Sequence, residues 1–100
     1  MPRDLNGIII NADAPFFEAL GVEALLRAKP LLRLADGMST SCVVRRFAAD
    51  TKEIVLHPFL HKKVCEYYGK DFVDIFKVGE KYDLMNGVCK IGEFLLLGYA

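Results

Sequence analysis

Ser41-Cys-Val-Val-Arg-Arg-Phe-Ala-Ala-Asp-Thr-Lys-Glu-Ile-Val-Leu-His57 is the stretch that decides the fold, because it predicts a β-hairpin. Residues 41–47 and 53–57 are rich in β-branched side chains, and residues 48–52 connect them as a loop. If residue 45 lies opposite residue 55, one face of the hairpin carries only apolar side chains, namely Cys42, Val44, Ile54 and Leu56. Such a face predicts a sheet that covers a hydrophobic core.

The opposite face of the hairpin mixes apolar and charged side chains, so it is not a simple solvent face. Arginine and aromatic side chains are frequent anchors of protein interfaces. We therefore predict an interaction surface made of Val43, Arg45, Phe47, Val55 and His57. On this prediction, Arg45→Glu weakens partner binding without unfolding the protein.

The remaining elements lie outward from the hairpin in both directions. Further strands are predicted over residues 5–11, 31–34, 81–84, 88–90 and 94–99, the last two joined by a turn at Ile91-Gly92. A helix capped at Asp13 or Ala14 extends towards Pro30, with Gly21 either tolerated inside it or splitting it in two. A second helix follows Pro58, over residues 59–68, and Gly69 ends it. Residues 71–76 fit helix and strand equally.

These elements predict the α+β class: an antiparallel, hairpin-built sheet of five to six strands with two short helices packed on it. The 100 residues are enough for a single domain, which spans 1–100. A partly parallel pairing at the sheet centre also fits, because a helix separates the first two strands. A doubly wound α/β fold is disfavoured, since strands and helices alternate too rarely. The order of the strands stays open.

Composition excludes several classes of protein. Hydrophobic residues make up 53% and charged residues 26%, which excludes disorder. No apolar run is long enough to cross a membrane, and the N-terminus lacks the apolar run of a signal peptide. The three cysteines, Cys42, Cys65 and Cys89, are odd in number and lie 23 and 24 residues apart, which does not fit a disulfide framework. We therefore expect a cytoplasmic protein that does not bind a membrane.

Charge is balanced overall but uneven along the chain. The formal net charge is zero, yet residues 26–63 hold eight basic and three acidic residues. This basic zone suggests an anion or nucleic-acid site formed by Arg45, Arg46, Lys52, Lys62 and Lys63. Against it, alternation along a strand sends Arg45 and Arg46 to opposite faces. Nucleic acid is therefore an alternative partner and not the favoured one.

Two further patterns raise the question of catalysis. His57, His61 and Cys65 follow one another at intervals of four, which suits zinc ligands or a thiol with its base. However, Pro58 places His57 before the helix, and neither a fourth ligand nor an orienting group is evident. Ser39-Thr40-Ser41 after Gly37 lacks the lysine and the glycine spacing of a phosphate loop, so we interpret it as a turn into the hairpin strand. We expect no metal site and no cofactor.

The C-terminal strand has no polar alternation. Phe94, Leu95, Leu96, Leu97 and Tyr99 need cover on both faces of the sheet, and two short helices cover only part of it. These apolar side chains can belong to the core, to a ligand pocket or to an interface, and the sequence does not decide between the three. As an interface, these five residues form the seam of a homodimer.

No motif in the sequence is specific for a chemistry. Size and composition favour a small non-catalytic cytosolic module for protein interaction, such as an adaptor, an inhibitor or an assembly subunit. Its partner is a protein, a second copy of the chain, or both. The alternatives are a nucleic-acid or polyanion binder that uses the basic zone, and a small enzyme that uses His57, His61 or Cys65.

Overall fold

The computed structural model describes residues 4–19 and 22–100, whose strands all belong to one antiparallel sheet. The strands are β1 (Leu5–Ile10), β2 (Leu31–Arg33), β3 (Ser39–Ser41), β4 (Val43–Phe47), β5 (Glu53–His57), β6 (Lys81–Asn86) and β7 (Cys89–Tyr99). The helices are α1 (Ala14–Ala19), α2 (Val22–Arg27), α3 (His61–Tyr68) and α4 (Phe72–Ile75). These seven strands and four short helices confirm the α+β class, with one strand and two helices more than predicted.

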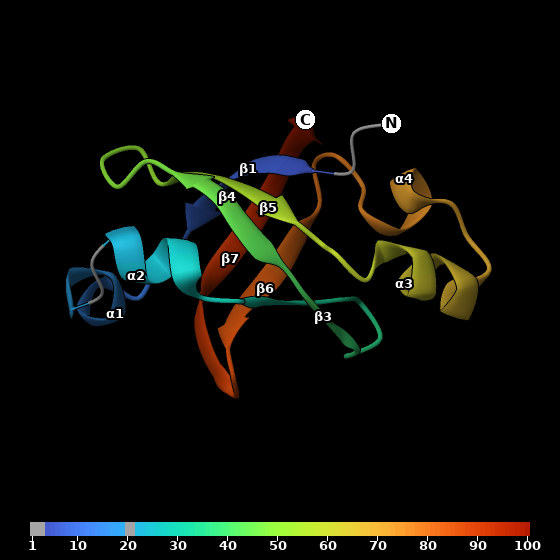
Figure 1. Ribbon diagram of the computed structural model, residues 1–100, viewed down its shortest axis with the longest axis horizontal. Coiled ribbons are helices and arrows are strands. Elements are labelled where there is room, and N and C mark those ends of the chain that lie inside the picture. The colour runs from blue at the N-terminus through green and yellow to red at the C-terminus, as the bar shows by residue number, and fades with distance from the viewer. Residues whose placement is uncertain (1–3, 20–21) are drawn as a thin grey trace.

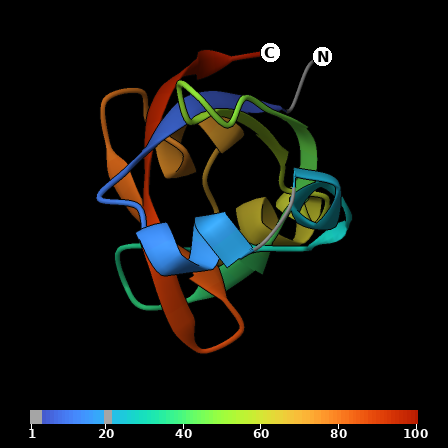
Figure 2. The same ribbon diagram turned by 90° about the vertical axis from the view of Figure 1, so that its left-hand side faces the viewer.

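The sheet curls round on itself. Its strands are hydrogen-bonded in the order β3-β2-β6-β7-β1-β5-β4. The first and the last strand of this order, β3 and β4, are separated in the chain by Cys42 alone. The Cys42 N–H donates to the carbonyl of Pro30 at 2.9 Å, which continues the pairing of β2 with β3 into the bend. The two ends of the sheet are therefore joined covalently, and Figure 2 shows the resulting ring of strands.

The helices lie at the two ends of this ring. Figure 1 shows α1 and α2 at one end of the long axis and α3 and α4 at the other. As predicted, Asp13 caps α1 by accepting a hydrogen bond from the Phe16 N–H at 3.2 Å, and Gly69, with a φ of 63°, ends α3. The predicted interruption at Gly21 lies outside the described residues. None of the described helices is long and apolar enough to cross a membrane.

The predicted pairing of residue 45 with residue 55 is wrong. Arg46 lies opposite Val55 and Phe47 opposite Ile54, because the register shifts between Val44 and Arg46. Arg45 is therefore the extra residue of a β-bulge, and every side chain after it changes face. The bulge turns Phe47 towards the inside of the ring, where it packs against the core.

The predicted turn at Ile91-Gly92 is also wrong, because β7 runs without a break. Gly92 lies opposite Leu84, and the next pair is formed one residue out of step, so this glycine lies at a bulge. A Cβ atom on Gly92 would come within 2.9 Å of the Ile9 side chain, so the glycine permits close approach of β7 to β1. All strand pairs in the described residues are antiparallel, so the partly parallel pairing does not occur there.

The core fills the inside of the ring and extends under α3 and α4. Fully buried side chains from β1, β2, β5, β6 and β7 form it, including Leu5, Leu32, Leu56, Leu84, Phe94 and Leu96. Two tyrosines hold α4 against the sheet. The Tyr82 hydroxyl donates to the carbonyl of Ile75 at 3.0 Å, and the Tyr99 hydroxyl donates to that of Phe76. The end of the molecule that carries α3 and α4 is thereby fixed to the sheet.

Candidate functional site

The predicted interaction surface lies on β4 and β5, and part of it is buried. Val43 lies opposite His57, and both are half-buried. Arg45 is exposed, whereas Val55 is 7% exposed. The Phe47 ring stacks on a phenylalanine ring of α1 at a centroid distance of 5.9 Å. The structure thus brings Val43, Arg45 and His57 together at the surface, and the role of all five residues in binding stays a prediction.

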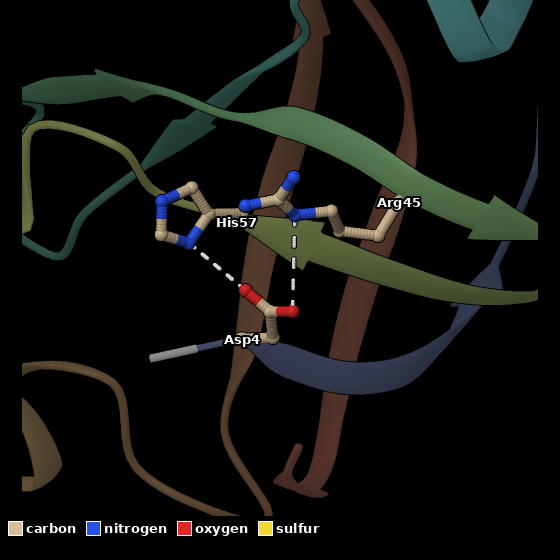
Figure 3. A network of polar contacts seen from close by, with 3 residues as sticks. All are labelled: Asp4, Arg45 and His57. Carbon is tan, nitrogen blue, oxygen red and sulfur yellow. Dashed lines mark ion pairs between the residues drawn. The ribbon is translucent and has the colours of Figure 1, made fainter. Parts of the chain in front are cut away.

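Asp4 bridges two of these residues (Figure 3). Its Oδ1 lies 2.9 Å from Nδ1 of His57, and its Oδ2 lies 3.8 Å from Nε of Arg45. The first contact is a close approach and not an aligned hydrogen bond, since His57 Nδ1 has no hydrogen-bond partner in the described part of the chain. An ion pair to a half-exposed arginine contributes about 0–1 kcal/mol. We therefore interpret the cluster as a link between the start of β1 and the β4–β5 hairpin.

His57, His61 and Cys65 lie where β5 passes into α3. His57 ends β5 and His61 begins α3, so Pro58 separates His57 from the helix as predicted. The two imidazole rings meet edge to face, with their centroids 5.9 Å apart. Cys65 lies one turn further along α3 and is half-buried. In residues 4–19 and 22–100, no group of three or more His, Cys, Asp or Glu side chains is placed to hold a metal ion.

The predicted dimer seam on β7 divides between two faces of the sheet. Phe94 and Leu96 are completely buried in the core, whereas Leu97 is 54% exposed. Leu95 is half-buried on the outside of the sheet, beside its strand neighbour Ile8. β7 pairs with β6 on one side and β1 on the other, so it offers a face and not an edge to a partner.

The predicted basic set is spread over the molecule. Arg45 and Arg46 are exposed on β4, and Lys62 and Lys63 are exposed on α3. Lys52 belongs to the loop between β4 and β5, which lies at the opposite end of the long axis from α3 (Figure 1). Its ammonium group donates to the carbonyl of Ala49 at 2.6 Å. The structure therefore places these five cations in at least two separate groups.

An open cleft of about 600 Å³ lies between the β2–β3 turn, β6 and the end of α3. Its lining holds four basic and four acidic residues, so it favours neither anions nor cations. Within it, the Tyr68 hydroxyl donates to Oδ1 of Asp36 at 2.7 Å. This bond lowers the pKa of Asp36, and burial together with the same bond raises the pKa of Tyr68 to about 12. We interpret this hydrogen bond as a brace between α3 and the β2–β3 turn.

A smaller hollow, which we call the β3–α3 groove, has a more distinctive lining. Its volume is about 290 Å³, and it is lined by Met38, Ser39, Thr40, Ser41, Leu60, Lys63, Val64 and Tyr67. Leu60 and Tyr67 are apolar or aromatic yet 41% and 66% exposed. Thr40 is 3% exposed, and its hydroxyl has no hydrogen-bond partner among the described residues. The groove thus combines exposed apolar surface with an unsatisfied buried polar group.

One side of this groove is a free strand edge. The Cys42 N–H donates to the carbonyl of Pro30, and the Leu34 N–H donates to the carbonyl of Met38. The backbone N–H and C=O groups of residues 38, 40 and 42 therefore point towards β2. Because backbone groups alternate in direction along an antiparallel strand, those of residues 39 and 41 point away from β2. In the described part of the chain, β2 is the only strand that pairs with β3. The outward groups of Ser39 and Ser41 are therefore available to another chain.

Comparison with known proteins adds nothing to this geometry, since no family model, curated protein or solved structure matches the chain. The β3–α3 groove does not follow from the sequence, because Ser39-Thr40-Ser41 predicts a turn into the hairpin strand and not a strand edge beside a helix. A signal was present in the serines and threonine that precede the hairpin strand, but their neighbours in α3 lie some twenty residues further along the chain.

Proposed function

We propose that the protein is a non-catalytic module for protein interaction, and that it binds its partner in the β3–α3 groove. The observation that carries this proposal is the exposure of Leu60 and Tyr67 beside an unpaired strand edge. Within α3, Val64 is buried and both Cys65 and Tyr68 pack partly against the core, whereas Tyr67 is left largely exposed. Apolar surface of this kind, next to polar groups, is typical of a site that a protein partner covers.

The composition of the groove supports binding over catalysis. The residues that line it include four hydroxyl groups and one ammonium group, but no histidine, cysteine or carboxylate. A serine or threonine hydroxyl needs an adjacent base to act as a nucleophile. The groove instead offers hydrogen bonds, apolar contact and one positive charge, which are the components of recognition.

The groove is favoured over the β4–β5 face because its apolar members are accessible. Val55 is 7% exposed and Phe47 packs against the core, so neither of these two apolar residues of the hairpin is accessible as an anchor for a partner. We place this module in the cytoplasm, because Cys42 is buried and Cys89 exposed without a disulfide on either. The role of adaptor, inhibitor or assembly subunit follows from the identity of the partner.

A displayed library of random peptides tests the proposal on the intact protein. Wild type, Tyr67→Glu and Val88→Glu serve as three immobilised targets. Val88 is 94% exposed in the turn between β6 and β7, so Val88→Glu is a matched control outside the groove. We expect the same peptides to be enriched on wild type and on Val88→Glu, and to be lost on Tyr67→Glu. No enrichment on wild type, or equal enrichment on all three proteins, contradicts the proposal.

The solution mass, measured by light scattering, shows whether a second copy fills the groove. If the protein is a monomer, the groove is accessible to a different protein. The same holds for a dimer that Leu97→Glu dissociates, because Leu97 lies on the predicted seam of β7 and not in the groove. A dimer that Tyr67→Glu dissociates means that the groove is a self-interface, which contradicts binding of a different protein there.

A further inference from the structure

We infer that the β3–α3 groove takes an extended acidic peptide, which adds to the sheet as a strand alongside β3. This inference rests on the proposed function and specifies the partner's conformation and charge. In this binding mode, backbone hydrogen bonds supply affinity, and pockets for alternate side chains supply specificity.

The backbone of β3 supplies the first half of the argument. Ser39 and Ser41 each point one N–H and one C=O away from β2, towards the side of the strand on which no other described strand lies. Four groups spaced along an edge are the template that an incoming strand needs. β3 has 3 residues. Since paired strands share a rise of about 3.3 Å per residue, β3 pairs with roughly three residues of a peptide.

The side chains of the groove supply the second half. Lys63 is the only charged residue among those that line it, and it forms no ion pair among the described residues. A carboxylate on the peptide complements this charge, whereas a basic side chain is repelled. Leu60 and Tyr67 flank the groove with apolar surface. The peptide therefore carries apolar side chains next to an acidic one.

The Thr40 hydroxyl gives an independent reason to expect a ligand. Buried polar groups in folded proteins nearly always have a hydrogen-bond partner. The Thr40 hydroxyl has none among the described residues, although the residue is 3% exposed and lines the groove. An acceptor on the peptide, either a carboxylate or a carbonyl oxygen, satisfies this hydroxyl.

Two matched peptide libraries test the charge of the ligand. Both alternate apolar residues with polar ones, and the polar positions hold Asp or Glu in the first library and Lys or Arg in the second. We expect enrichment from the acidic library on wild type, and a switch to the basic library on Lys63→Glu. Lys62→Glu is the matched control, since Lys62 is exposed on the same helix but does not line the groove.

N-methylation of an enriched peptide tests the strand geometry. Methylating one amide at a time removes one donor, and strand addition makes only alternate positions sensitive, each by up to about ten-fold in Kd. If wild type enriches peptides from both libraries, the ligand is not specifically acidic. If methylation leaves Kd unchanged, or if affinity is lost at consecutive positions, the peptide does not add as a strand. In these cases the proposed function still stands. Failure of both libraries and of the random library refutes the proposed function itself.

Discussion

At Thr40 we predict that stability and binding are opposed. Leaving a buried hydroxyl without a partner costs about 1–3 kcal/mol, whereas valine has nearly the same shape and no polar group to satisfy. The residue is buried within a strand, where β-branched side chains are favoured.

We predict that Thr40→Val raises the free energy of unfolding by about 1 kcal/mol and weakens binding of the enriched acidic peptide. Urea denaturation and a binding titration measure the two effects on one protein sample. A variant that is less stable than wild type, or one that binds the peptide equally well, shows that the hydroxyl has a partner in the free protein.

Cys42 and Cys89 have different surroundings, so we expect them to differ in reactivity. Burial raises the pKa of Cys42 to about 12, so its reactive thiolate form is absent at neutral pH, whereas Cys89 is exposed. We predict that a thiol reagent modifies Cys89 within the native protein and Cys42 only after unfolding. Peptide mapping by mass spectrometry locates the modified thiols. Rapid modification of Cys42 in the native protein would contradict the burial of the bend between β3 and β4.

Among the elements, the strands of the hairpin could be predicted from the sequence, but their bulge could not. The β-branched runs fixed the existence of β4 and β5, because propensity and alternation act locally. The bulge at Arg45 depends on how the pair curves into the ring, which is a property of the whole sheet. Similarly, the sequence around Gly92 predicts a turn, because a glycine in a strand and a glycine in a turn look alike in one sequence.

Gly7 shows how closely β1 and β7 approach each other. A Cβ atom at this position would overlap the carbonyl oxygen of Leu95 and lie 2.6 Å from the ring of Phe94. Both obstacles belong to the buried central strand, so neither can yield easily.

We predict that Gly7→Ala lowers the free energy of unfolding by about 3 kcal/mol through overpacking. Gly98→Ala is the matched control, since it lies on β7 with nothing within 4 Å of the added Cβ. Thermal denaturation compares the two variants with wild type. Equal stability of both variants would show that the spacing of β1 and β7 is wider than described.

On the scale of the whole molecule, the site arises from the curl of the sheet. Bending at Cys42 sends β4 to the far end of the strand order and leaves β3 with one edge that no other described strand pairs with. α3 lies beside that edge and forms the other side of the groove. Local patterns in the sequence predict α3 and the hairpin separately, but their meeting depends on contacts between distant residues. For this reason the sequence predicts the hairpin face as the interaction surface, whereas our proposal of the groove depends on the tertiary structure.

The most direct test of the central claim is a calorimetric titration of one enriched peptide into wild type, Tyr67→Glu and Arg45→Glu. These variants place the same charge on the groove and on the β4–β5 face, where Arg45 is exposed. If the groove is the binding site, Tyr67→Glu raises Kd by about ten-fold or more, as loss of an aromatic anchor does, and Arg45→Glu changes it by less than about two-fold. The reverse pattern, with binding lost in Arg45→Glu and retained in Tyr67→Glu, would contradict the account and assign recognition to the hairpin.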